Sequence, residues 1–372
     1  MSDSGYRGGC RTPRDALRPP GRTRGSTALE IWATRTPETG TAEHQARRAE
    51  AAGWDGITFT DSQNLVGDPF VAVALASRAT RHLRFATGVT NAHTRHPAAL
   101  AAVAATVQEE SGGRFVLGIG RGDTALFHLG RPPMPVAAFT ARAGEVQTYL
   151  AGGTVDCDGF PSRLRWLDRA RQPKVPLDVA ASGPRVIEFA ARTAERVTLA
   201  VGAHPERVAW ALDLARKAAD GAGRDPATIS FGAYVNVGCL PDRDQARDLI
   251  AGGVAAFAHF SAMPGSTGAG LAGDDRAVVA EVGRRYDSTR HLVNTADHTA
   301  PLAPGFVERF AVVGDPDRCT ERLRALAALG VERLVVTGAT LGADREQARQ
   351  AERLFTGEVI PALRERPGGA SP

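Results

Sequence analysis

The stretch 83–123, LRFATGVTNAHTRHPAALAAVAATVQEESGGRFVLGIGRGD, decides the fold. It contains a short apolar run, an alanine-rich segment that begins at Pro97 and closes on two glycines, and a second short apolar run. Proline at the first turn and glycine just past the last turn are usual limits of a helix. Short runs without polar alternation fit strands that are buried on both faces. The stretch therefore predicts two parallel strands joined by a helix.

The same two patterns alternate along the chain from residue 28. Eight strand–helix units favour a closed (β/α)8 barrel, a TIM barrel, over an open doubly wound sheet. We predict one barrel domain over 27–368, and we interpret 153–175 and 259–308, which break the repeat, as insertions at the C-terminal mouth of the barrel. The predicted strands are 29–34, 56–61, 83–89, 115–120, 176–181, 196–201, 232–238 and 333–339. The clearest predicted helices are 42–53, 98–113, 183–195, 204–223 and 316–330.

The formal net charge of +4 lies entirely in residues 1–26, which contain six arginines and two aspartates. This segment is rich in Gly, Pro and Arg and cannot build a core, so we expect a disordered tail. The remaining residues are neutral overall. Because nucleic-acid binding needs a basic face, we expect no nucleic-acid partner.

The 372 residues are 43% hydrophobic and 23% charged, as in an ordinary globular enzyme. No apolar run approaches the ~20 residues of a membrane-spanning helix, and the start of the chain lacks the apolar core of a secretory signal. The four cysteines are far apart and have no histidine at metal-ligand spacing. We therefore expect a cytoplasmic protein with reduced cysteines, no metal and no membrane partner.

Active sites of barrels lie where the strands end, so polar residues at these ends are the first candidates. Asp61 follows the second predicted strand and is either a general base, a substrate anchor or a simple loop cap. Gly88, inside the third run, marks a bulge or the close approach of a ligand. Arg95 and His96 are expected to bond to the rim of the barrel just before the helix that begins at Pro97.

Two glycine-containing turns are candidate cofactor contacts. The segment 118–124 lacks the G-K-[ST] of a phosphate loop, and it follows the fourth strand, whereas a dinucleotide fingerprint opens the first unit. Its small residues would instead let a flat ring lie against the backbone. The segment 182–185 leads directly into a helix, whose first N–H groups favour a phosphate; the alternative is a capping Ser with Pro in the first turn.

No Ser-His-Asp order, Cys-His pair, H-E-x-x-H motif or pair of carboxylates at catalytic spacing is present. A barrel with a candidate phosphate site and few reactive side chains indicates that a bound cofactor supplies the reactivity.

The segments 51–63, 86–130 and, more loosely, 175–195 resemble the bacterial luciferase-like monooxygenases. The resemblance is closest to the branch that uses the deazaflavin coenzyme F420, which includes methylenetetrahydromethanopterin reductase. It implies a cytoplasmic barrel enzyme, commonly a homodimer through helices beside the second and third strands, that moves a hydride between F420 and a small organic substrate. Reduction of a C=C, C=N or C=O bond is the expected direction.

Matching positions imply a bulge with a non-prolyl cis peptide bond at Gly88-Val89, against the central ring of the cofactor. Asp61 matches an acidic position near the ring, and Asp61 and Asp123 are the candidate catalytic acids. The further cofactor contacts that the resemblance implies are Thr90 and Asn91 beside the ring, Gly122 near its ribityl or pyrimidine side, and Ser182, Gly183 and Pro184 at the phosphate.

The chain departs from the family pattern in two places. Some relatives carry a catalytic histidine directly after the acidic position, where this chain has Ser62. A common Asp-Gly pair is replaced by Glu195-Arg196. For these reasons the resemblance does not carry the pterin substrate of the reductase over to this chain.

Two alternatives keep the same fold. One is a monooxygenase that uses FMN and O2 with a partner flavin reductase, because FMN shares the tricyclic ring and the phosphate-bearing side chain. The other is a barrel that binds a flavin without catalysis.

Overall fold

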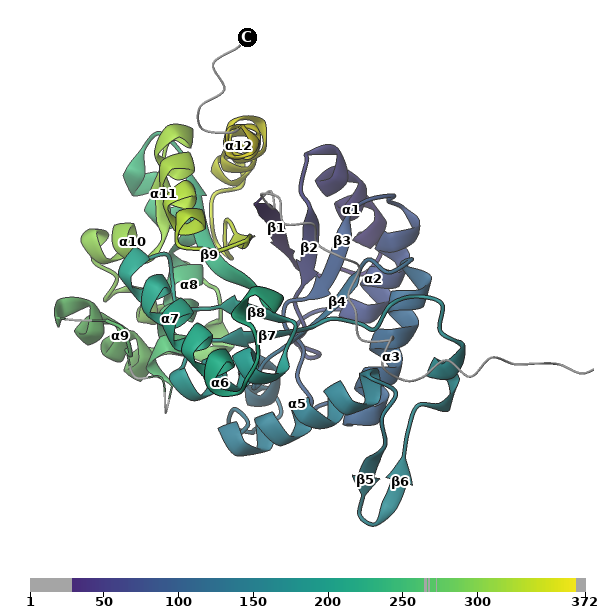
Figure 1. The fold of residues 1–372 in the computed structure, drawn as a ribbon. Helices are drawn as coiled ribbons and strands as arrows, with labels where there is room; N and C mark the ends of the chain where they lie inside the picture. The colour runs from purple at the N-terminus through teal and green to yellow at the C-terminus, as the bar shows by residue number, and fades with distance from the viewer. Residues whose placement is uncertain (1–28, 264–265, 267, 272, 366–372) are drawn as a thin grey trace, which may run out of the picture.

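The computed structural model describes residues 29–263, 266, 268–271 and 273–365, in which eight parallel strands close into a barrel (Figure 1). The ring runs from β9 through β11, β1, β2, β3, β4, β7 and β8, and the pairing of β8 with β9 closes it. The TIM-barrel prediction is confirmed, whereas the predicted tail 1–26 lies outside the described residues. The strands are β1 (Glu30–Arg35), β2 (Gly56–Phe59), β3 (Arg84–Thr87), β4 (Phe115–Ile119), β7 (Leu177–Ala181), β8 (Arg196–Leu199), β9 (Ser230–Cys239) and β11 (Arg333–Thr337).

Helices surround the barrel, as Figure 1 shows. Their starts follow local chemistry: the Asp68 carboxylate accepts two backbone N–H groups at the start of α2, and His96 Nδ1 accepts the N–H of Ala98 at the start of α3. No helix in the described part of the chain is long and apolar enough to cross a membrane. The barrel helices are α1 (Ala42–Ala51), α2 (Pro69–Arg78), α3 (Pro97–Glu110), α4 (Thr124–Phe127), α5 (Val136–Leu150), α6 (Pro184–Thr193), α7 (Pro205–Gly221), α8 (Arg243–Ala262), α11 (Pro316–Ala328), α12 (Arg345–Leu354) and α13 (Ile360–Arg364).

The predicted insertion 259–308 lies at the mouth of the barrel. It begins in the last turn of α8 and continues through α9 (Gly273–Arg285) into α10 (Pro304–Phe310). A short strand, β10 (Val312–Gly314), then pairs with the C-terminal half of β9. The segment reaches the same rim as the strand ends, because Met263 and His291 lie in one cavity with Gly88, which follows β3.

The segment 153–175 does not lie at the mouth, which corrects the prediction. It folds as a hairpin of β5 (Val155–Cys157) and β6 (Phe160–Ser162), and Figure 1 shows this hairpin projecting from the barrel beside α5. The segment follows a helix and precedes the first residue of β7, so it belongs to the N-terminal edge. There Gln108 Nε2, near the end of α3, donates a hydrogen bond to the carbonyl of Pro173.

A network of charged side chains fills the interior of the barrel at this N-terminal edge. Arg333 on β11 is 1% exposed and donates from Nη2 to Asp178 Oδ2 at 3.0 Å and to Thr198 Oγ1 at 2.8 Å. Arg196 on β8 lies 3.4 Å from a carboxylate oxygen of Glu30 and 3.8 Å from Asp178. Buried charges persist only when they are paired and hydrogen-bonded, as these are.

The same network fixes the protonation of Glu30. Burial by itself would raise the pKa of this carboxyl group, but the positive charges of Arg196, Arg84 and Arg333 outweigh burial and lower the pKa to about 2. Glu30 is therefore ionised at neutral pH.

Removing one cation should destabilise this network. We expect Arg333→Met to lower the free energy of unfolding by about 3–5 kcal/mol, because it leaves the buried Asp178 carboxylate without its hydrogen-bonded partner. Denaturant unfolding measures the change. In Arg349→Met, which removes an exposed partner of Glu346, the change should stay under about 1 kcal/mol. Equal losses in both variants would contradict a structural role for the network.

Candidate active site

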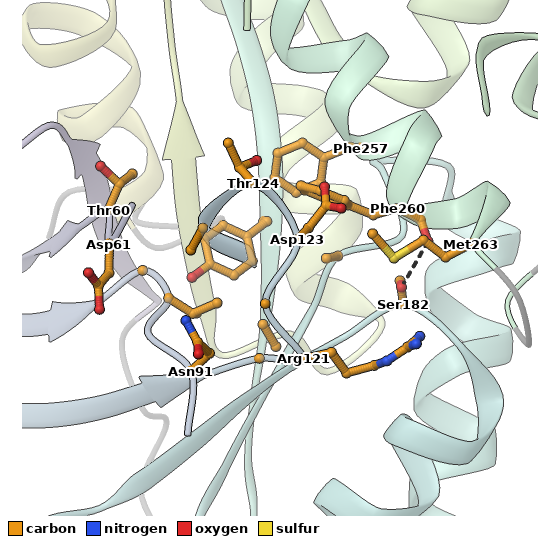
Figure 2. Close-up of a pocket in the computed structure, with 18 of the residues that line it drawn as sticks. Thr60, Asp61, Asn91, Arg121, Asp123, Thr124, Ser182, Phe257, Phe260 and Met263 are labelled. Carbon is orange, nitrogen blue, oxygen red and sulfur yellow. Dashed lines mark hydrogen bonds between the residues drawn. The ribbon is translucent and has the colours of Figure 1, made fainter. Parts of the chain in front are cut away.

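A pocket of about 220 Å³ opens at the C-terminal ends of the strands (Figure 2). Its walls come from the loops after β2, β3, β4 and β7, from the end of α8 and from the insertion 259–308. Thr90 is buried behind the wall, where its Oγ1 accepts from Arg95, and Pro184 is the first residue of α6. The other predicted site residues line the pocket: Asp61, Gly88, Val89, Asn91, Gly122, Asp123, Ser182 and Gly183.

One wall of the pocket is mostly backbone. The peptide bond between Gly88 and Val89 is cis, where the family resemblance implied one. A Cβ on Gly88 would lie 2.6 Å from the side chain of Thr58, and a Cβ on Gly118 would lie 2.0 Å from the carbonyl oxygen of Thr87. Only glycine permits these two close approaches, of the end of β3 to β2 at Gly88 and of β4 to β3 at Gly118.

The opposite side of the pocket is apolar. It is formed by Phe257 and Phe260 on α8 and by Ala180 and Ala200 at the ends of β7 and β8. Figure 2 shows the two phenylalanines on the side away from Asp61. A slot with a backbone wall and an apolar wall suits a flat ring.

Asp61 is held in an ion pair. Its carboxylate, whose side chain is 3% exposed, accepts from Arg95 Nη1 at 2.5 Å, and Arg95 Nη2 donates to Asp68 at 2.7 Å. Burial alone would lower the pKa of Arg95, but the charges and hydrogen bonds of Asp61 and Asp68 raise it. The expectation that Arg95 and His96 bond at the rim is confirmed. A carboxylate engaged in this way is suited to orienting a loop and poorly suited to donating a proton.

The carboxylate of Asp123 differs from that of Asp61 in its hydrogen bonding. Its Oδ2 atom is buried without a hydrogen-bond partner among the described residues, and it lies 3.4 Å from Nε2 of His259, near the C-terminal end of α8. Figure 2 places Asp123 beside Phe260 and Met263, across the pocket from Asp61. A buried, unbonded carboxylate oxygen next to a pocket is a typical place for a ligand contact.

The insertion supplies an aromatic cluster that the sequence analysis did not identify. The ring of Tyr286 stacks on His259 with centroids 3.9 Å apart, and on His298 with centroids 4.4 Å apart. Tyr286 Oη lies 2.5 Å from Nδ1 of His291, and His291 lines the pocket. These residues lie up to 39 positions apart, in α8 and in the segments that follow it, so no spacing rule could have grouped them.

The titration of this cluster follows from its burial. Burial lowers the pKa of His291 to about 4, although the charge of Asp123 opposes the shift. Burial also raises the pKa of Tyr286, and the negative charges of Asp123 and Asp287 add to this. At neutral pH the histidine is therefore a neutral imidazole and the tyrosine is a neutral phenol.

The end of the pocket near α6 is positively polarised. Gly183 is the capping position of α6 and supplies no side-chain cap, and Ser182 Oγ donates to the carbonyl of Phe260 at 3.2 Å (Figure 2). The interpretation of Ser182 as a helix cap is therefore wrong. Burial lowers the pKa of Arg121, and the nearby charge of Arg185 lowers it further. Two guanidinium groups beside a helix N-terminus form an environment that favours an anion.

These features fit a planar cofactor with an anionic tail. The flat wall at Gly88-Val89 and the apolar wall at Phe260 would enclose the ring. Arg121, Arg185 and the first N–H groups of α6 would hold the charged tail.

The replacement of an Asp-Gly pair by Glu195-Arg196 has no bearing on the substrate. Arg196 belongs to the charged network at the N-terminal edge, and Glu195 accepts the backbone N–H of Leu177 at the start of β7. Both residues lie at the end of the barrel opposite to the pocket, so this departure says nothing about the ligand.

Comparison with known proteins identifies a matching family and similar enzymes. The family model described as luciferase-like monooxygenase matches residues 23–333. The 5,10-methylenetetrahydromethanopterin reductase of Methanolobus tindarius is 28% identical, over 82% of this chain and 92% of that protein. The 4-hydroxyprotoasukamycin monooxygenase of Streptomyces nodosus subsp. asukaensis is 27% identical, over 83% and 81%.

The fold comparison agrees with the barrel described above. The solved structure of the coenzyme F420 dependent tetrahydromethanopterin reductase of Methanopyrus kandleri superposes with a TM-score of 0.69 at 24% identity. The match covers 90% of this chain and 99% of that one.

The lowered pKa of His291 predicts a pH-dependent stability. The imidazole has a pKa of about 4 in the folded chain and 6.5 when exposed, so its contribution is complete above pH 6.5 and is lost as the pH falls to 4. Between these pH values, we expect the wild type to lose up to about 3 kcal/mol more unfolding free energy than His291→Gln. Denaturant unfolding at both pH values measures this. The exposed control His44→Gln should lose as much as the wild type; equal losses in all three proteins would contradict the prediction.

Proposed function

The chain belongs to the luciferase-like monooxygenase family, and from this premise we propose that it is an oxidoreductase that uses the deazaflavin coenzyme F420. It would transfer a hydride between this cofactor and a small organic substrate, in the direction of C=C, C=N or C=O reduction. The relatives named as methylenetetrahydromethanopterin reductases match over most of the chain, and the solved reductase structure that superposes on it is named as coenzyme F420 dependent, which supports the choice of F420. The observation that carries a cofactor of this shape is the slot between Gly88-Val89 and Phe260, whose lining includes Arg121 and the residues at the N-terminus of α6.

In this proposal the cofactor supplies the hydride and the chain supplies its placement. Gly88, Val89 and Asn91 line the face of the ring, and Gly122 lies beside them. The ion pair between Asp61 and Arg95 holds the loop after β2 against the loop after β3. Holding the two reactants in a fixed geometry is a large part of catalysis when a cofactor carries the reactivity.

The anionic tail would lie at the N-terminus of α6. Ser182 and Gly183 line the pocket there and Pro184 begins the helix, while Arg121 and Arg185 provide the positive charge. We assign this end of the pocket to the phosphate of the cofactor.

Cofactor preference is testable directly. We expect oxidised F420 to bind the full-length chain at least about tenfold more tightly than FMN, measured by fluorescence in one buffer. The opposite preference would contradict the proposal and would favour an oxygen-using monooxygenase with a separate flavin reductase. If neither F420 nor FMN binds, both the F420-dependent and the FMN-dependent function are excluded.

A matched pair of variants tests the placement of the tail. Arg185→Met should weaken F420 binding about tenfold, because a charge-assisted contact is lost. The affinity for a deazaflavin that lacks the phosphate should not change. Arg192→Met removes an exposed arginine in the last turn of the same helix and should change neither affinity.

We also propose that the chain forms a homodimer through α2 and the loop before it. Leu65, Val71 and Leu75 are 52%, 59% and 44% exposed, and the last two lie one turn apart on α2. Contiguous exposed apolar side chains are typical of an interface. Val71→Asp should shift the sedimentation of the protein from dimer to monomer, and Phe160→Asp, at an exposed apolar side chain of the β5–β6 hairpin, should not. A wild-type monomer would contradict this proposal.

We place the protein in the cytoplasm. Cys157, Cys239 and Cys319 are free thiols, and the neighbouring thiol of Cys239 raises the pKa of Cys319. Unbonded cysteines in contact are typical of a reducing compartment.

A further inference from the structure

The side chains that close the pocket opposite the strand ends form an ordered group. Tyr286 is sandwiched between His259 and His298, with its ring plane 8° from the first and 29° from the second. The backbone N–H of Asp287 donates to His298 Nδ1 at 3.3 Å, which holds that ring in place. The phenol therefore has little freedom to turn, and its Oη atom is directed at His291.

The direction of the hydrogen bond between Tyr286 and His291 decides which nitrogen of the imidazole carries the proton, and either group could be the donor. A neutral phenol and a neutral imidazole form a hydrogen bond with the O–H as donor when Nδ1 is unprotonated. The short 2.5 Å separation is that of such a bond. With the phenol as the donor, the proton of the imidazole is on Nε2, which has no hydrogen-bond partner among the described residues.

We propose that His291, oriented by Tyr286, is the catalytic proton donor of this site, and that the substrate presents a carbonyl oxygen or an imine nitrogen to Nε2 of His291. His291 lies on the pocket wall beside Phe260. It belongs to the insertion, whereas the catalytic histidine of some family members follows the acidic position that Asp61 matches. Since Ser62 stands at the position after Asp61, the described pocket has no imidazole there. This inference rests on the proposed function, because a reduction is what requires the proton.

The chemical step balances with these two residues. Reduction of a C=O or C=N bond places a hydride, from the reduced deazaflavin of the proposed function, on the carbon and moves the π electron pair to the heteroatom. The heteroatom takes the Nε2 proton of His291, while Nδ1 takes the Oη proton of Tyr286. The imidazole stays neutral with its tautomer exchanged, and water from the mouth of the pocket reprotonates the phenolate. Passing a proton through a positioned side chain typically accelerates such a step by about 10²–10⁴-fold.

Asp123 and His259 assist from the side. This assistance belongs to the resting site, before the transfer: the Asp123 carboxylate lies 3.4 Å from His259 Nε2, and its negative charge keeps the neighbouring phenol protonated until the substrate heteroatom takes the Nε2 proton of His291. Tyr286 thus relays a proton to His291, His259 is a positioning residue for Tyr286, and within this cluster His291 is the residue that lines the pocket.

The experiment determines the tautomer of His291 by NMR on the full chain labelled with ¹⁵N-histidine, with assignment through His291→Gln. We expect the wild type to carry its proton on Nε2 at neutral pH. Tyr286→Phe, which removes only Oη, should yield a mixture of tautomers. Tyr149→Phe removes another buried hydroxyl, one bonded to Cys157 and outside the pocket, and should leave the signals of His291 unchanged. A proton on Nδ1 in the wild type, or signals unaffected by Tyr286→Phe, would overturn the proposal.

Acetone serves as the carbonyl probe in the same samples. Its titration should shift the Nε2 signal of His291, and His291→Gln should weaken its binding about three- to tenfold, the effect of one hydrogen bond. Binding of acetone that leaves the Nε2 signal unchanged would overturn the role of His291. Oxidised F420, titrated into wild type and Tyr286→Phe, should bind equally well. Failure of F420 to bind either protein, with the Nε2 tautomer present, would contradict the proposed function and not the geometry of the pair.

Discussion

The paired charges at the N-terminal edge of the barrel fix the register of the strands, on which the pocket at the other end depends. Glu30, Asp178, Arg196 and Arg333 come from four different strands and meet inside the ring, so each strand is held in register by a partner on another. This arrangement fills one end of the barrel with side chains and their hydrogen bonds. The glycine and apolar residues of the pocket lie at the opposite ends of the strands, chiefly those of β3, β4, β7 and β8.

One wall of the pocket is mostly backbone, and the other carries titratable side chains. At Gly88 and Gly118 the backbone comes so close to its neighbours that no larger residue fits, which gives a rigid flat surface. The titratable groups face that surface from α8 and the insertion. A rigid barrel that presents a cofactor to a variable segment agrees with the general finding that one fold can support many reactions through its loops.

Sequence reasoning succeeded where the physical signal is local. Buried parallel strands are contiguous apolar runs, and all eight were predicted. It failed where the answer depends on tertiary contacts: Arg95, the partner of Asp61, is 34 residues away, and Tyr286 meets His259 only through the folding of the insertion. The hairpin after α5 was assigned to the wrong edge because the helix Val136–Leu150 was not recognised. With that helix recognised, the hairpin follows a helix and precedes a strand, which places it at the N-terminal edge of the barrel.

The closed base of the barrel also sets the order in which molecules can come and go. With charged side chains filling the interior at one end, the described pocket communicates with solvent through the rim alone, so two ligands stacked in it share a single entrance. The ligand seated against the strand ends must enter first and leave last. In the proposed function, the product would therefore leave the pocket before the cofactor ring beneath it could exchange.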